Sequence, residues 1–185
     1  MNKIQEQSLK TLILVADDNE TNVALLEAIL DGDGYTNISS ATDPRKVKAL
    51  FQKWRYDLVV LDIRMPHMDG LEVMEQLRLV TELDYMPVLV LTADTNPETR
   101  LQALEIGAKD FIAKPFGHAE FLHRVRNMLE VWLLYKRQRW QAEHFEAMVR
   151  ERTTELHETR LEIIRRLGRA GEYRDNEMGM HIMRM

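Results

Sequence analysis

The sequence predicts an α/β protein with a doubly wound, five-stranded parallel sheet, followed by one long helix. Five short strand-like segments, most of them apolar, alternate with four amphipathic helical segments over the first two thirds of the chain. Glycines such as Gly70 and Gly107 lie where these units need turns or helix ends. After His118 neither glycine nor proline occurs until Gly168, which favours an unbroken helix.

The predicted strands are apolar runs of the kind that lie buried on both faces of a parallel sheet. They span residues 11–16, 37–41, 57–62, 87–92 and 110–114. The predicted helices between them span roughly residues 20–31, 44–54, 68–81 and 97–106. Because crossovers between parallel strands are right-handed, this alternation brings the carboxyl ends of the strands to one edge of the sheet.

Polar residues follow four of these strands, at the edge where such sheets carry their reactive groups. They are Asp17 and Asp18 after the first strand, Asp62 after the third, Thr92 after the fourth and Lys114 after the fifth. Three carboxylates held together repel one another, and a hard divalent cation with oxygen ligands relieves that repulsion. The sequence therefore predicts a Mg²⁺ site, with Asp17 and Asp18 as ligands.

Asp62 is the predicted nucleophile, because it ends the central strand and is followed by the loop Ile63-Arg64-Met65-Pro66. An aspartate beside Mg²⁺ can attack a phosphoryl group and form an acyl phosphate. Lys114 would place its ammonium against the phosphoryl oxygens, and the Thr92 hydroxyl would hydrogen-bond to them. Phosphorylation adds about −1.5 to −2 charge at neutral pH, enough to reposition this hydroxyl and a nearby ring.

These residues, in this order, resemble the receiver (CheY-like) domain of two-component response regulators over residues 10–130, after an N-terminal tail at residues 1–9. That family carries an acidic pair, a phosphoacceptor aspartate, a Thr or Ser followed by a small residue, and Lys-Pro. The corresponding residues here are Asp17-Asp18, Asp62, Thr92-Ala93 and Lys114-Pro115.

The resemblance implies a flavodoxin-like fold, Mg²⁺ as cofactor and a sensor histidine kinase as the partner that phosphorylates Asp62. It also implies that Asp18 is the more direct metal ligand of the acidic pair, with Asp62 and the backbone carbonyl of Arg64 as further ligands. The switch aromatic is Phe111, where tyrosine is frequent in the family, so coupling through a tyrosine hydroxyl is not available. A receiver that keeps these residues but is never phosphorylated is the alternative.

The composition limits the other possibilities. A chain of 185 residues has room for one domain and an extension, and it contains no cysteine, which excludes disulfides and thiol chemistry. No apolar stretch approaches the ~20 residues of a membrane span, and the first ten residues lack a signal-peptide core. We therefore expect a cytoplasmic protein without membrane contacts. The net charge of −5 offers no argument for nucleic-acid binding.

The long helix is predicted to span residues 118–167 and to form a parallel homodimer through a two-stranded coiled coil. Every seventh residue is apolar in the column Phe121, Met128, Tyr135, Ala142, Val149, Leu156 and Ile163. The complementary column is mixed, with Val131 and Phe145 but also Arg124, Gln138, Arg152 and Thr159. Such a seam favours a coiled coil over an isolated helix. The alternative is a helix folded back onto its own receiver.

Three aromatic residues, Trp132, Tyr135 and Trp140, lie near the place where this helix leaves the predicted domain, beside the basic run at residues 136–139. They are interpreted as a packing cluster with a solvated basic face. A hinge that transmits the state of the receiver to the coil is the second interpretation.

Residues 161–185 resemble the opening of the HD-GYP domain of cyclic di-GMP phosphodiesterases. In that family the Glu and His of a Glu-x-x-x-His element are metal ligands, which implies Glu177 and His181 here, although Met178 stands where threonine is common. A spacing of four places both residues on one face of a helix. The chain ends before the His-Asp pair and the Gly-Tyr-Pro loop of that domain, so we expect it not to be an enzyme by itself.

Two functions therefore remain open. In the first, phosphorylation of Asp62 acts through the coiled coil on a phosphodiesterase output in a longer parent protein. In the second, the chain is a stand-alone dimeric receiver that signals by protein contacts alone.

Overall fold

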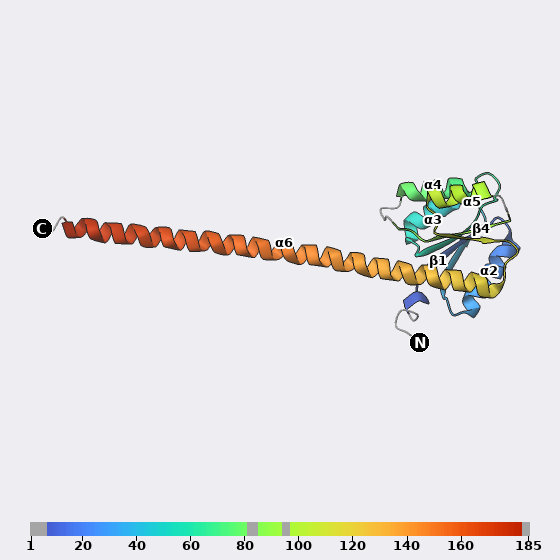
Figure 1. The fold of residues 1–185 in the computed structure, drawn as a ribbon, viewed down its shortest axis with the longest axis horizontal. Coiled ribbons are helices and arrows are strands. Elements are labelled where there is room, and N and C mark those ends of the chain that lie inside the picture. The colour runs from blue at the N-terminus through green and yellow to red at the C-terminus, as the bar shows by residue number, and fades with distance from the viewer. Residues whose placement is uncertain (1–6, 81–84, 94–96, 183–185) are drawn as a thin grey trace. The chain divides into compact units, whose positions relative to one another are not determined.

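A computed structural model describes the backbone of residues 7–80, 85–93 and 97–182, and the side chains of these ranges up to Arg166, Pro97 excepted. The chain divides into two units, Met1–Lys136 and Arg137–Met185. The first unit contains the sheet and its helices (Figure 1). The second unit belongs to the long C-terminal helix.

The sheet has five parallel strands in the order β2-β1-β3-β4-β5, which confirms the predicted fold class. The strands are β1 (Leu12–Ala16), β2 (Asn37–Ala41), β3 (Leu58–Asp62), β4 (Val88–Thr92) and β5 (Asp110–Ala113). From β1 the chain winds to β2 on one side and to β3 on the other, so the order reverses between β1 and β3. Open α/β sheets bind ligands beyond the carboxyl ends of the strands at such a point.

The helices between the strands lie close to their predicted positions. They are α2 (Glu20–Gly32), α3 (Val47–Trp54), α4 (Gly70–Val80) and α5 (Pro97–Ile106). The segment predicted as one helix over residues 44–54 is divided, because a 3-10 turn at Pro44–Lys46 precedes α3. Asp43 caps this turn by accepting a 3.0 Å hydrogen bond from the Arg45 amide, and proline suits its first position.

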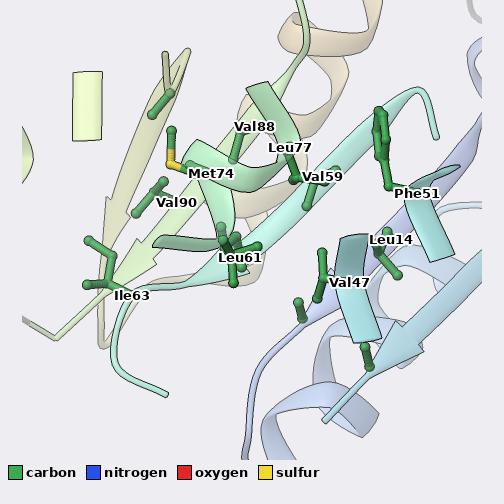
Figure 2. Packing of buried hydrophobic residues seen from close by; sticks show 14 of the residues in the cluster. Leu14, Val47, Phe51, Val59, Leu61, Ile63, Met74, Leu77, Val88 and Val90 are labelled. Carbon is green, nitrogen blue, oxygen red and sulfur yellow. The ribbon is translucent and has the colours of Figure 1, made fainter. Parts of the chain in front are cut away.

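Alternate residues of each strand supply two apolar layers, one on each face of the sheet. One layer packs against α3, α4 and α5, and Figure 2 shows Val47, Phe51, Met74 and Leu77 of these helices against Leu14, Val59, Leu61 and Val90 of the strands. The other layer packs against α2 and the first turns of α6 (His118–Ile182). Helices on both faces explain why β1, β3 and β4 are apolar almost to their last residue, whereas β2 at the sheet edge is mostly polar.

The first turns of α6 belong to the core of the first unit. Phe121 and Met128 are buried against the sheet, and Tyr135 packs at the margin of the same cluster. These are the first three members of the predicted heptad column, so they are already covered within one chain. The column is exposed from Ala142 onward, so only that part of the predicted coiled-coil seam is open to a partner, and the coiled coil itself stays a prediction.

The structure also corrects the end of this helix, which was predicted at residue 167. The α6 backbone continues through Gly168 to Ile182. A helical glycine costs about 1 kcal/mol relative to alanine, a penalty that does not by itself end a helix. Among the described residues, no helix combines the length and the apolar character that crossing a membrane requires.

Candidate functional site

Three carboxylates meet at the point where the strand order reverses. Asp17 follows β1, and Asp62 is the last residue of β3, its neighbour in the sheet. Asp17, Asp18 and Asp62 each offer a carboxylate oxygen within 4.8 Å of the others. Asp17 and Asp62 are buried, whereas Asp18 is exposed. The structure therefore brings the predicted acidic triad together and leaves it open to solvent on one side.

Lys114 links two members of this triad. Its Nζ donates to Asp17 Oδ2 at 2.7 Å and to Asp62 Oδ1 at 2.9 Å. Its backbone amide donates to the Thr92 carbonyl oxygen at 2.7 Å, which ties the end of β5 to the end of β4. The Lys114-Pro115 peptide bond is cis. Sequence reasoning placed this lysine at the correct edge, and the structure adds its two carboxylate partners.

The Asp17 carboxylate is held by residues that open α2. The Asn19 amide donates to Oδ1 at 2.9 Å, and Asn22 Nδ2 lies 3.0 Å from both carboxylate oxygens. Asn19 also caps the helix, since its Oδ1 accepts from the Thr21 amide at 2.9 Å. Sequence reasoning missed Asn22, whose only signal was an amide side chain in the first turns of the helix after the acidic pair.

Burial and charge shift the protonation equilibria of the two central groups. Burial raises the pKa of Asp62, and the neighbouring charges of Asp17 and Asp18 add to that rise, while Lys114 opposes it. Burial alone would lower the pKa of Lys114. Its hydrogen bonds to Asp17 and Asp62 outweigh that effect and raise the pKa, so the lysine stays charged.

The residues of the triad fit a divalent cation. Three carboxylates and one ammonium leave a formal charge of −2, which one divalent ion balances. Carboxylate oxygens are the ligands that Mg²⁺ prefers. Asp18, the exposed member, is the one that an ion arriving from solvent can reach first.

The loop after Asp62 depends on Gly70. A Cβ atom at Gly70 would lie 2.4 Å from the Asp62 carbonyl oxygen and 2.9 Å from Ile63 Cα, so only glycine fits. The Gly70 amide donates to the Ile63 carbonyl oxygen at 2.8 Å. Asp69 and Glu72 accept from each other's amides at 2.8 Å and 3.0 Å, which fixes the first turn of α4. Sequence reasoning identified Gly70 only as a turn residue.

The two predicted switch residues lie on neighbouring strands. Thr92 is buried at the end of β4, within reach of the Lys114 backbone. Phe111 lies further back on β5, opposite Val90, and is partly buried against the first apolar layer. The guanidinium carbon of Arg100 lies 4.7 Å from the centre of the Phe111 ring.

A pocket of about 400 Å³ adjoins Lys114. Its wall is mostly apolar and comes from α2, β4 and the start of α6, with Asn22, Leu25, Leu26, Leu91, Lys114, Pro115, Phe116 and His118 as lining residues. The recess therefore lies beside the acidic triad.

The second predicted metal pair, Glu177 and His181, is not tested by side-chain geometry. Both residues belong to the helical backbone of α6, but their side chains lie outside the described residues.

Comparison with known proteins agrees with this geometry. The family model for the response regulator receiver domain matches residues 13–126. Chemotaxis protein CheY4 from Vibrio cholerae superposes with a TM-score of 0.61 at 28% identity, covering 64% of this chain and 98% of that one. The receiver domain of sensor histidine kinase PA1611 from Pseudomonas aeruginosa, solved with a magnesium ion coordinated in its active-site cleft, gives 0.59 at 28% identity, covering 65% and 98%.

Two curated relatives are longer proteins. Response regulator MprA of Mycolicibacterium vanbaalenii is 42% identical over 63% of this chain and 49% of its own length. A probable cyclic di-GMP phosphodiesterase of Vibrio cholerae is 31% identical over the whole of this chain and 42% of its own length. The chain thus spans less than half the length of these relatives. Because the family model covers more than half of the chain, with the acidic triad and its lysine inside the match, the chain belongs to the response regulator receiver domain family.

Proposed function

We propose that this chain is a phosphorylation-controlled receiver in which Asp62 accepts a phosphoryl group from a sensor histidine kinase. The observation that carries the proposal is the position of Lys114 Nζ, 2.7 Å from Asp17 and 2.9 Å from Asp62. Asp17 would hold the metal, and Asp62 would both bind it and react. A purely structural ion pair would not require the third, exposed carboxylate at Asp18.

In the proposed reaction an Asp62 carboxylate oxygen attacks the phosphorus of the phosphohistidine. A new O–P bond forms as the P–N bond breaks, and the imidazole leaves with the electron pair of that bond. The Lys114 ammonium, already beside Asp62, would move from the carboxylate to a phosphoryl oxygen. Its raised pKa keeps it charged for this contact.

Asp17, Asp18, Asp62 and the backbone carbonyl of Arg64 would hold Mg²⁺ in this site. When bound, the ion supplies positive charge that neutralises the triad and the phosphoryl oxygens. The charge of −2 on the group of three aspartates and one lysine supports this assignment. Thr92 and Phe111 would change conformation on phosphorylation. The threonine hydroxyl would hydrogen-bond to the phosphoryl group, and the phenylalanine ring would change its packing.

Incubation with radiolabelled acetyl phosphate and Mg²⁺ tests the site. The parent chain should incorporate label, and Asp62→Asn should abolish the incorporation. Asp43→Asn is the matched control, because Asp43 is a carboxylate that pairs with Arg45 at the surface and lies outside the triad. Equal labelling of Asp62→Asn and the parent would refute the assignment of the phosphoacceptor.

The pocket beside Lys114 supports a protein phosphodonor. Its apolar wall, with the half-exposed Leu25 at the rim, offers a contact surface next to the reacting carboxylate. A partner that carries phosphohistidine must approach Asp62 from this open edge of the sheet, and we place the reaction in the cytoplasm. Leu25→Glu should slow transfer from the histidine kinase while leaving labelling by acetyl phosphate unchanged.

We further propose that the receiver acts through a homodimeric coiled-coil helix on an HD-GYP phosphodiesterase output in a longer parent protein. The alignment with the probable cyclic di-GMP phosphodiesterase supports this, because it covers the whole of this chain, including the long helix. By the resemblance of residues 161–185, Glu177 and His181 would be metal ligands of that output. The chain alone should not hydrolyse cyclic di-GMP, and measurable turnover would contradict this.

The second candidate is a stand-alone receiver that signals by protein contacts. The receiver match over residues 13–126 alone would suffice for it. Reading the gene beyond the codon for Met185 separates the two candidates. A continuing frame with a His-Asp pair and a Gly-Tyr-Pro loop supports the phosphodiesterase, whereas an immediate stop supports the stand-alone receiver.

A further inference from the structure

The second unit exposes an apolar column along its whole described length. Every side chain described from Arg137 to Arg166 is exposed in the single chain. In the apolar column Leu156 is 65% exposed, Ile163 is 51% exposed and Val149 is 48% exposed, and Phe145 of the mixed column is 65% exposed. Large apolar side chains at heptad spacing form the contact surface of coiled coils. Their exposure in the single chain therefore indicates a surface that a partner helix can cover.

The column is too narrow for a membrane surface. Helices that lie on membranes present a wide apolar face opposite a strongly charged one. Here the positions that alternate with Ala142, Val149, Leu156 and Ile163 include Arg152 and Thr159. A seam of one apolar column and one mixed column fits a second helix of the same kind.

We propose that two copies of this chain pair in parallel and in register over Ala142–Ile163, with Glu155 of each copy facing Arg160 of the other. This inference rests on the proposed homodimer and specifies its geometry. In a parallel coiled coil, residues that flank the seam meet across the interface at a spacing of five. The flanking pairs along this segment, counted from the residue before it, are Gln141 with Glu146, Met148 with Thr153, and Glu155 with Arg160. One pair is of opposite charge and none is of like charge.

The flanking pair specifies the alignment, and the polar positions in the seam must be accommodated within it. In register, Arg152 meets Arg152 of the second copy, and Thr159 meets Thr159, while Val149, Leu156 and Ile163 form purely apolar layers. The Arg152 guanidinium already reaches Glu155 of its own helix at 2.6 Å, so its charge lies at the flank and its methylene groups in the layer. A shift by one heptad would set Glu155 opposite Thr153 or Leu167 of the second copy, so the Glu155–Arg160 attraction would be lost. Charged residues that flank a seam select partner and alignment in this way.

Disulfide formation tests this geometry cleanly, because the chain has no cysteine of its own. Three single-cysteine variants are compared under diamide oxidation: Val149→Cys and Leu156→Cys in the seam, and Ala147→Cys on the opposite side of the same helix. Parallel, in-register helices bring each seam cysteine beside its copy, whereas Ala147 lies beyond disulfide reach. Both seam variants should form covalent dimers roughly tenfold or more faster than the control.

In an antiparallel pair, the two copies of a residue lie side by side only at the centre of the overlap. At most one of the two seam variants could then form a disulfide. Covalent dimers from only one seam variant, from neither, or equally fast from Ala147→Cys would overturn the proposed register. Circular dichroism checks that each variant keeps its helix, and labelling of Asp62 checks the receiver separately. A monomer mass in light scattering would refute the homodimer itself, whereas a dimer with the wrong crosslinks would refute only its geometry.

A charge exchange provides the independent measurement. Glu155→Arg and Arg160→Glu each replace two attractive pairs per dimer by repulsive ones, so each should weaken dimerisation roughly five- to tenfold. Mixing the two variants restores opposite charges across both flanks, and heterodimers should predominate. Random mixing of the two variants would contradict the Glu155–Arg160 contact.

Discussion

Trp132 Nε1 donates a 2.7 Å hydrogen bond to Asp57 Oδ1, which joins α6 to the start of β3. Asp57 Oδ2 accepts from the Leu12 amide at 3.0 Å, and Oδ1 also accepts from Lys136 Nζ at 2.9 Å. The Trp132 ring stacks on Tyr85, with 6.0 Å between ring centres. The strand β3 therefore carries the candidate phosphoacceptor at one end and the anchor of α6 at the other.

Replacing Trp132 by phenylalanine should destabilise the receiver by about 1–2 kcal/mol, because a buried carboxylate loses one donor and the smaller ring leaves space unfilled in the core. The control is Trp140→Phe, since Trp140 is 64% exposed and should change the free energy of unfolding by less than ~0.5 kcal/mol. Urea unfolding followed by circular dichroism measures both. Equal effects would show that the hydrogen bond to Asp57 contributes nothing.

Asp62 should make the metal-free protein less stable at neutral pH. Burial raises its pKa above the ordinary value of 3.8, so the folded state binds more protons than the unfolded state between the two pKa values. Stability therefore falls as the pH rises through that window, and the deficit persists at higher pH. Asp62→Asn should unfold at a higher temperature than the parent at pH 7 in a chelator.

The same comparison has two internal controls. The advantage of Asp62→Asn should shrink as the pH falls below about 4, where the carboxyl group is protonated in both states. It should also shrink when Mg²⁺ stabilises the parent. A variant that is less stable than the parent at pH 7 would mean that the Lys114 ion pair outweighs the cost of burial.

Gly70→Ala should destabilise the receiver by about 1–3 kcal/mol, although alanine is the better helix former by about 1 kcal/mol. The added Cβ would meet the Asp62 carbonyl oxygen at 2.4 Å, so the loop must move. Gly32→Ala is the matched control, because a Cβ at Gly32 at the end of α2 would meet no atom within 4 Å. It should be neutral or stabilising in thermal unfolding. Stabilisation by both changes would refute the close approach.

Asp17 and Asp18 should separate structure from metal binding. In Asp17→Asn, an amide NH₂ group would face the donors of Asn19, Asn22 and Lys114, which would lose an acceptor. The free energy of unfolding should fall by about 1–3 kcal/mol. Asp18→Asn, at an exposed position, should cost less than ~0.5 kcal/mol. Calorimetric titration should show weaker Mg²⁺ binding in both variants. Unchanged Mg²⁺ affinity in Asp18→Asn would remove that residue from the proposed metal site.

The three aromatic residues near the point where α6 leaves the first unit show which contacts a sequence pattern can predict and which it cannot. Trp132 and Tyr135 do form a packing cluster, and Tyr85 completes it from the segment before β4. Trp140 does not join that cluster, because it is exposed and stacks on His144 within the second unit. Sequence spacing placed all three aromatics near one another along the helix, but only the sheet decides which of them have a surface to cover.

The sequence by itself determined the fold class and the location of the candidate site, because apolar runs followed by polar residues describe strands and the edge at which they end. Asp17, Asp18, Asp62, Thr92 and Lys114 could be assigned to that edge without coordinates. Only the tertiary structure decided that Asn22 holds Asp17, that Gly70 lies against Asp62 and that Asp57 anchors Trp132. Periodicity records which faces of an element are apolar, whereas such contacts join residues far apart in the chain and exist only once the layers have packed.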